Sequence, residues 1–244
     1  MNKVECALNI ATVAFLLVPL PVQAIEYVYA KTEKVKEILY CAGFKGHEEA
    51  MRLYQEALEL EPDCANIYDR RALELESQGK YEEALQDSSK AVNLAPEYPS
   101  FSILKARILF HLGRYEEAMD ALEIVFKTEK RVYGREYCRI YGACLYHQGK
   151  YKESLSALGS NSHHQGGGPS INCYYYMGMC ELKLGRPEKA LEYLNVAITL
   201  RPQDARKEFF LARAEVYDNL GKKELATEDR KKAETMKYRH WSSF

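Results

Sequence analysis

The hydrophobic positions of the chain follow a helical period that is interrupted at regular intervals. Between residues 66 and 96, apolar residues recur three or four positions apart on both sides of Gly79, and Pro96 ends the pattern. Residues at positions i, i+3, i+4 and i+7 share one face of an α-helix, so the pattern predicts two helices, each with one buried face. Glycine costs about 1 kcal/mol in a helix interior, and Gly79 is therefore expected in the turn between them.

The same arrangement of two helices and a turn recurs along the chain. The turn glycines are spaced 34, 36, 36 and 36 residues apart, at Gly79, Gly113, Gly149, Gly185 and Gly221. A small residue keeps the same register in the second helix, at Ala50, Ala84, Ala118, Ser154, Ala190 and Ala226. A fixed period of this length indicates a stack of similar helical pairs, which forms grooves more readily than catalytic clefts.

The repeated unit resembles the tetratricopeptide repeat (TPR). The sequences GKYEEAL at Gly79 and GRYEEAM at Gly113 match its G-x-Y-x-x-A core, preceded by an aromatic and a small residue and followed by alanine and proline. The resemblance covers about residues 31–237 and implies an all-α solenoid of about six helix–turn–helix repeats. The second helices are expected to begin near Lys45, Gly79, Gly113, Gly149, Gly185 and Gly221.

The fourth repeat departs from the pattern. A polar, glycine-rich segment and Pro169 follow Leu158, so its second helix is predicted to stop near Leu158. The expected organisation is an N-terminal block of about four repeats at residues 25–158, a flexible Gly-rich loop at 159–170, a C-terminal pair of repeats at 171–238 and a tail at 239–244.

The first 24 residues differ in kind from the rest. Lys3 precedes an apolar run from Ala7 to Val22, and Val22-Gln23-Ala24 fits the small-x-small rule of signal peptidase. This order predicts a signal peptide at residues 1–24 and a protein of the secretory pathway or another extracytoplasmic compartment. Two alternatives stay open: an uncleaved membrane anchor, and an apolar helix packed on the first repeat of a cytoplasmic protein.

Composition narrows the class of partner. The formal net charge is −1 and 28% of the residues are charged, which gives no indication of a nucleic-acid partner. Residues 45–100 are rich in acids and the end of the chain is basic, which indicates either a solvated surface or an electrostatically polar molecule that orients a partner or stacks head to tail. The seven cysteines form no C-x-x-C motif, and most are expected to be small buried hydrophobes.

No set of residues with catalytic or metal-binding spacing emerges. His163 and His164 have no further ligand in their loop, and Gly166–Gly168 lack the Lys-Ser/Thr of a phosphate loop. We therefore expect a non-enzymatic protein without cofactor or metal that binds a protein or peptide.

The resemblance implies that the first helices line a concave groove. The candidate peptide-binding residues come from the third, fourth and fifth repeats: Arg107, Phe110, His111, Arg139, Tyr146, His147, Tyr175, Met179 and Lys183. Aromatic and arginine side chains dominate the binding energy of many interfaces, and this lining favours an apolar ligand with acidic groups.

The resemblance also allows one known ligand to be assessed. Some repeat proteins of this kind hold an EEVD-type chaperone tail in a clamp of basic and asparagine residues, but the corresponding places hold Val35, Leu39, Arg70, Ser100 and Leu104. Such a tail is not expected, because its carboxylates would meet apolar side chains. A weaker likeness to the repeat portions of J-domain co-chaperones, without the J domain, leaves a secretory or periplasmic holding chaperone as an alternative to an adaptor.

Overall fold

The computed structural model describes residues 28–128, 134–160 and 169–236. The predicted signal peptide at residues 1–24, most of the Gly-rich loop and the tail at 239–244 lie outside these ranges, so the predictions about them stay predictions. Within the described ranges the chain forms twelve α-helices, one short 3-10 helix (Pro202–Asp204) and no strand. The all-α prediction is confirmed.

The helices pair into six repeats, as predicted, and the second helix of each repeat begins two residues after the expected position. The pairs are α3 (Glu33–Ala42) with α4 (His47–Leu60), α5 (Ala65–Ser77) with α6 (Tyr81–Leu94), α7 (Pro99–His111) with α8 (Tyr115–Thr128), α9 (Arg135–His147) with α10 (Tyr151–Gly159), α11 (Ile171–Lys183) with α12 (Pro187–Thr199), and α13 (Lys207–Asn219) with α14 (Lys223–Thr235).

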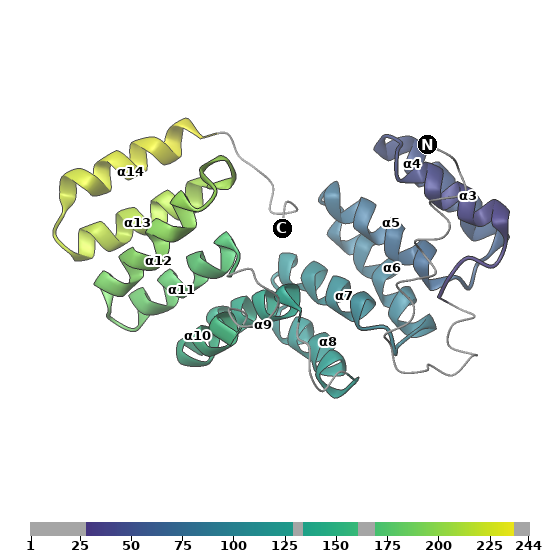
Figure 1. The fold of residues 1–244 in the computed structure, drawn as a ribbon, viewed down its shortest axis with the longest axis horizontal. Helices are drawn as coiled ribbons and strands as arrows, with labels where there is room; N and C mark the ends of the chain where they lie inside the picture. Colours follow the sequence, from purple (N-terminus) through teal and green to yellow (C-terminus); the bar gives the residue numbers. More distant parts are fainter. Residues whose placement is uncertain (1–27, 129–133, 161–168, 237–244) are drawn as a thin grey trace.

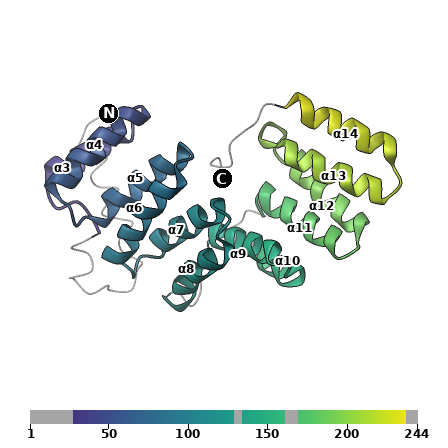
Figure 2. The same ribbon diagram turned by 180° about the vertical axis from the view of Figure 1, so that it is seen from behind.

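The six pairs form an arc. Figures 1 and 2 show α9 and α10 at the middle of the bend and the two ends of the stack rising on either side, with α7 inside α8. From α5 to α13, each first helix packs against the first helix of the next repeat, whereas successive second helices make no comparable contact among the described residues. Helices that converge on one side and spread on the other curve the stack, so the first helices form its inner layer.

The turn glycines have the conformation that their recurrence predicts. All five have a positive φ, between +72° and +76°. At Gly113 the backbone N–H donates to the carbonyl of Phe110 at 3.0 Å, and the N–H of Arg114 donates to the carbonyl of Leu109 at 2.9 Å. This pair of bonds closes the end of the first helix and requires a left-handed residue, which glycine provides without a Cβ clash.

The fourth repeat is shortened where the sequence predicts it. The α10 helix has 9 residues, whereas α8 has 14 and α12 has 13. Ser154 occupies the register position that is alanine in the other repeats, and its buried hydroxyl donates to the carbonyl of Gly142 at 2.6 Å. The hydroxyl is satisfied in the core, so serine replaces alanine here without an unpaired polar group.

The second repeat and the sixth repeat each contain a half-buried ion pair that joins the two helices of that repeat. The guanidinium of Arg71 on α5 donates two hydrogen bonds to Asp87 on α6, at 2.6 and 2.7 Å. Arg213 on α13 binds Asp229 on α14 in the same way, with both bonds at 2.7 Å. The two repeats are thus closed by matching bidentate pairs near the two ends of the stack.

The described part of the chain contains six of the seven cysteines. Its six cysteines are free, and all except Cys41 are buried, as expected for small hydrophobes. No helix in the described ranges combines the length and apolarity needed to cross a bilayer.

The turn geometry predicts a clear difference between two glycine substitutions. Gly113→Ala should lower the free energy of unfolding by about 1 kcal/mol, because alanine is strained at positive φ although no atom lies within 4 Å of the added Cβ. Gly43→Ala is the matched control, since Gly43 has φ −65° in a right-handed conformation and alanine should be neutral or slightly stabilising there. Urea denaturation of both variants measures the difference, and equal destabilisation would contradict this account of the turns.

Candidate functional site

The inner side of the arc presents one face of five first helices. We use the name inner face for the side chains of α5, α7, α9, α11 and α13 that lie along this side: Asp69, Leu73, Glu76, Arg107, Phe110, Glu136, Arg139, Tyr146, Tyr175, Lys183, Glu208, Leu211 and Glu215. Asp69, Leu73 and Glu76 are three to four residues apart and therefore share one face of α5, and Glu208, Leu211 and Glu215 do so on α13. The remaining residues, on α7, α9 and α11, are assigned to the inner face by the contacts described below.

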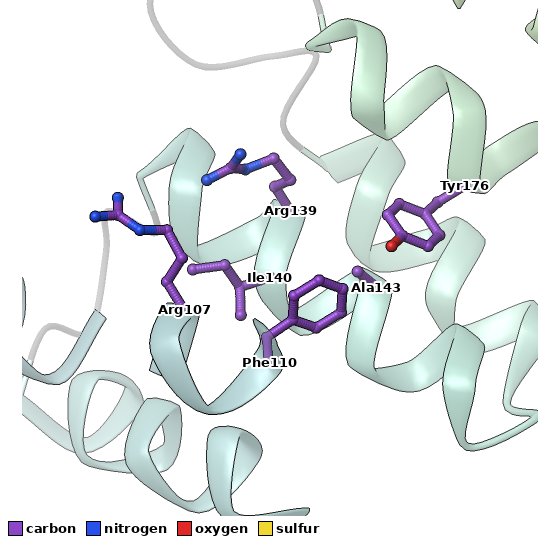
Figure 3. Close-up of a pocket in the computed structure, with 6 residues that line it drawn as sticks. All are labelled: Arg107, Phe110, Arg139, Ile140, Ala143 and Tyr176. Atoms are coloured by element: carbon purple, nitrogen blue, oxygen red, sulfur yellow. The ribbon is translucent and has the colours of Figure 1, made fainter. Parts of the chain in front are cut away.

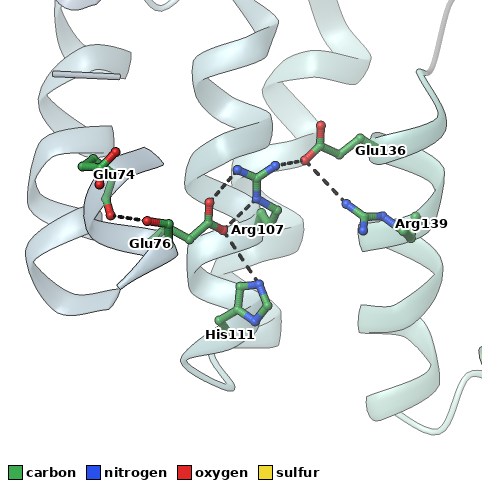
Figure 4. Close-up of polar contacts among 7 residues, drawn as sticks. Glu74, Glu76, Arg107, His111, Glu136 and Arg139 are labelled. Atoms are coloured by element: carbon green, nitrogen blue, oxygen red, sulfur yellow. Dashed lines mark hydrogen bonds and ion pairs between the residues drawn. The ribbon is translucent and has the colours of Figure 1, made fainter. Parts of the chain in front are cut away.

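An ion network joins three consecutive first helices on the inner face (Figure 4). Nε and Nη2 of Arg107 on α7 donate to the two carboxylate oxygens of Glu76 on α5, at 2.7 and 2.6 Å. Nη1 of Arg107 donates to Glu136 on α9. Nη2 of Arg139 lies 3.5 Å from the same oxygen of Glu136, and Nε2 of His111 lies 3.8 Å from Glu76. All three guanidinium nitrogens of Arg107 therefore donate to carboxylates of the same chain.

A small apolar pocket lies beside this network (Figure 3). Its lining comes from α7, α9 and α11: Arg107, Phe110, Arg139, Ile140, Ala143 and Tyr176. About 230 Å³ of space lies among these side chains, part of it open to solvent. Arg139 is only 8% exposed, and burial lowers the pKa of its guanidinium. The pocket is thus an apolar crevice edged by two arginines that already have partners.

Aromatic rings continue the inner face toward α13. The rings of Phe110 and Tyr176 are 6.4 Å apart between centroids, those of Tyr146 and Tyr176 are 5.5 Å apart, and those of Tyr175 and Phe209 stack at 5.0 Å. Burial raises the pKa of Tyr146 to about 12, so its phenol stays neutral and can donate a hydrogen bond. These rings link α7, α9, α11 and α13 into one apolar row.

Asp69 is a carboxylate that the fold leaves without an ion-pair partner in the described ranges. Burial raises its pKa to about 6, although Arg70 and Arg107 act in the opposite direction. Arg107 is engaged with Glu76 and Glu136, and Arg70 donates to Asn66. Leu73, one turn along α5, is 41% exposed. The start of the inner face therefore combines an uncompensated negative charge with exposed apolar surface.

The nine candidate residues from the sequence fall into three groups. Arg139 and Met179 are buried, and the side chain of His111 is nearly so. Arg107, Phe110, Tyr146 and Tyr175 are half-buried, and His147 and Lys183 are exposed. Phe110 and His147 lie together, with ring centroids 5.7 Å apart, and Lys183 pairs with Glu215 at 3.5 Å. The half-buried rings pack on their neighbours, so alanine substitution there would disturb the fold as well as any binding.

Eight residues of the site are absent from the nine candidates: Asp69, Leu73 and Glu76 on α5, Glu136 on α9, Tyr176 on α11, and Glu208, Leu211 and Glu215 on α13. Glu136 binds Arg107, and Tyr176 closes the pocket. The repeat period could have indicated Glu136, because it stands 36 residues before Asn172 and 36 after Ser100, both at first-helix positions of the same register. The positions of the tail clamp behave as expected, since Val35, Leu39 and Leu104 are buried in the core.

The described ranges contain no group of three or more histidine, cysteine or acidic side chains that could hold a metal ion. The pair His163 and His164 lies outside those ranges.

Comparison with known proteins identifies the repeat. Residues 75–130 and residues 171–204 each match a model of the tetratricopeptide repeat. No curated protein sequence matches the chain significantly.

Solved structures with low sequence identity share the fold. A tetratricopeptide repeat protein from Parabacteroides merdae is 17% identical, with 86% of this chain and 81% of that one covered and a TM-score of 0.66. PilW, a type IV pilus biogenesis factor, is 14% identical, with coverages of 82% and 92% and a TM-score of 0.70. YrrB, described as a TPR protein with an unusual peptide-binding site, is 20% identical, with coverages of 74% and 90% and a TM-score of 0.52.

At these identities the structural likeness establishes the fold alone. The matched segments contain helices from the third and fifth repeats, and those repeats share their period and turn geometry with their neighbours. Residues 75–130 and 171–204 are thus identified as tetratricopeptide repeats, and the chain shares its fold with tetratricopeptide-repeat proteins.

Proposed function

We propose that this protein is a non-enzymatic scaffold whose inner face binds an extended segment of a partner protein. Proteins of this family are generally protein-interaction scaffolds, and some bind peptides. The observation that carries the proposal is the solvent-exposed apolar surface at both ends of the inner face, where Leu73 is 41% and Leu211 46% exposed. Between these two leucines, the half-buried rings of Phe110, Tyr146 and Tyr175 on α7, α9 and α11 offer further apolar contact, so a bound segment can bury apolar side chains at several points along the arc.

The charges of the inner face favour a basic segment. The arginines, from which the sequence indicates an acidic ligand, are already engaged with carboxylates or buried. Asp69 near one end and Glu208 near the other have no ion-pair partner in the described part of the chain. A lysine or arginine of the ligand at Asp69 would supply the missing countercharge, and its apolar neighbour would cover Leu73.

Asp69 also lowers the stability of the fold, which supports a binding role. A carboxyl whose pKa is raised by burial is held in its charged form at neutral pH against a desolvation penalty. Side chains that reduce stability without structural benefit are found preferentially at functional sites.

The compartment follows from the N-terminal prediction. If residues 1–24 are a signal peptide, binding takes place outside the cytoplasm. We retain the secretory or extracytoplasmic assignment as part of the proposal.

Self-association through the first repeat is a second candidate with its own observation. Tyr40 and Phe44 are 65% and 74% exposed at the end of α3, and their ring centroids are 5.0 Å apart. Light scattering on the Tyr40→Ser/Phe44→Ser variant tests this, since an oligomer held by these rings should dissociate. An unchanged mass would remove this candidate.

Peptide selection tests the proposed function directly. Peptides selected from a random display library on the purified protein should bind Leu73→Ala and Leu211→Ala several-fold more weakly, because each substitution removes exposed apolar contact worth about 1 kcal/mol. Ile124→Ala is the matched control, since Ile124 is 39% exposed but lies on the second helix α8. Fluorescence anisotropy measures the affinities, and equal affinities for all three variants, or no selected peptides, would refute the proposal.

Asp69→Asn should separate stability from binding. The free energy of unfolding at pH 7.5 should rise by about 1–2 kcal/mol, because the raised pKa of Asp69 means that its charged form is disfavoured in the native state. The native state takes up this proton at higher pH than the unfolded chain does, so the advantage of the variant should shrink as the pH falls through about 6.

The same variant should bind selected basic peptides about five- to tenfold more weakly, the loss expected for one charge-assisted contact. Asp120→Asn, an exposed position on α8, serves as the control and should alter neither quantity. Denaturation curves across this pH range provide the measurement. A destabilised Asp69→Asn variant would show that the carboxylate is part of the framework instead.

A further inference from the structure

Residues 237–244 carry basic and aromatic side chains that complement the carboxylates and the exposed apolar surface of the inner face. Three are basic or become so on protonation and three are aromatic: Lys237, Arg239 and His240, and Tyr238, Trp241 and Phe244. We propose that this segment docks on the inner face at α11 and α13 and is an internal ligand of the same surface that binds the partner. The proposal rests on the proposed function, and it adds how access to that surface is controlled.

Met236, the residue before the segment, lies beside the inner face. Met236, the last described residue, is half-buried and packs on a cluster that contains Phe209, Phe210 and Ala233. Tyr175 of the inner face packs on the same cluster and stacks on Phe209. The first residues after Met236 therefore start within reach of the rings of α11 and α13.

The nearest part of the inner face offers negative charge. Glu208 and Glu215 lie close enough to Tyr175 to raise the pKa of its phenol further, after burial and Tyr146. Glu208 is half-buried and makes no ion pair with the residues that the structure describes. Glu215 forms an ion pair with Lys183 at the surface, with 3.5 Å between the nitrogen and the oxygen. Arg206 and Lys207, which precede Glu208, are engaged in interactions of their own. A cation from outside the described residues can therefore be accommodated here.

The same part of the inner face offers apolar surface. Leu211 lies between Glu208 and Glu215 on α13 and is 46% exposed, and Tyr146 and Tyr175 are half-buried beside it. Aromatic side chains next to basic ones match this alternation of carboxylates and apolar groups. Ring pairs contribute about 0.5–1.5 kcal/mol beyond the area that they bury.

The length of the segment sets its range. Eight residues in extended conformation span at most about 26–29 Å, and packed neighbouring helices lie about 8–10 Å apart. The segment can therefore cross α13 and α11 and reach α9. An arm of this length covers the aromatic part of the inner face, where an outside peptide would have to displace it.

Trp241 makes the proposal directly testable, because it is the one tryptophan of the sequence. In the full chain its emission should be blue-shifted, and its acrylamide quenching constant severalfold smaller, relative to a synthetic peptide of residues 237–244. The paired substitutions Glu208→Gln and Glu215→Gln should return both values toward those of the free peptide. Glu192→Gln is the control, since Glu192 is exposed on the second helix α12, and it should leave both values unchanged.

Charge exchange distinguishes direct contact from a general change in fold. Lys237→Glu with Arg239→Glu should release Trp241, and adding Glu208→Lys with Glu215→Lys should restore its protection. Trp241 quenched as in the free peptide would overturn the proposal, and so would protection that depends on protein concentration, which would indicate docking on a second copy.

Removal of residues 237–244 connects the segment to partner binding. If the segment is docked nine-tenths of the time, its removal should tighten the apparent Kd for library-selected peptides about tenfold. Unchanged affinity together with an exposed Trp241 refutes the internal ligand and leaves the scaffold function intact. A protected Trp241 in a protein that selects no peptides refutes the scaffold function and supports docking of the segment.

Discussion

In each repeat the two helices pack closely together. The close packing is possible because one position of the second helix holds a small residue. The six register positions, Ala50, Ala84, Ala118, Ser154, Ala190 and Ala226, are completely buried. In the fourth and fifth repeats the facing position on the first helix is a glycine, Gly142 or Gly178. A Cβ there would come within 2.5–2.7 Å of Leu158 or Leu194 on the second helix. The close distance between the two helices of a repeat determines which part of the first helix is covered by the second and which part belongs to the inner face.

Close packing of successive first helices makes the inner face a rigid surface. Arg107 holds α5, α7 and α9 together through Glu76 and Glu136, and the row of rings continues the connection to α13. A ligand meets side chains that are already ordered, which lowers the entropy lost on binding. In the proposed scaffold, the charges that have no partner within the described residues, above all Asp69, would select the ligand.

The sequence predicts the repeats well because the repeats are local. Period, turn glycines and small residues are determined within about 36 residues, and the break after Leu158 is visible in its glycine and proline neighbours. The inner face is harder to predict, because its charge balance depends on contacts between residues about 30 positions apart. Arg107 is cationic in the sequence, but Glu76 and Glu136 pair with it in the folded chain, and this pairing is the reason why we propose a basic ligand and not an acidic one.

The short α10 helix has a consequence for the way the stack comes apart. In a repeat protein, stability is approximately the sum of the repeats and their nearest-neighbour interfaces, and unfolding spreads from one repeat to the next. The fourth repeat supplies only nine residues of second helix, so α10 has less surface to pack against α9 than the longer second helices α8 and α12 have within their own repeats. Local opening of α10 should therefore require less free energy than unfolding of the whole stack, and its amide protons should exchange faster than those of α8 and α12 while the arc stays assembled.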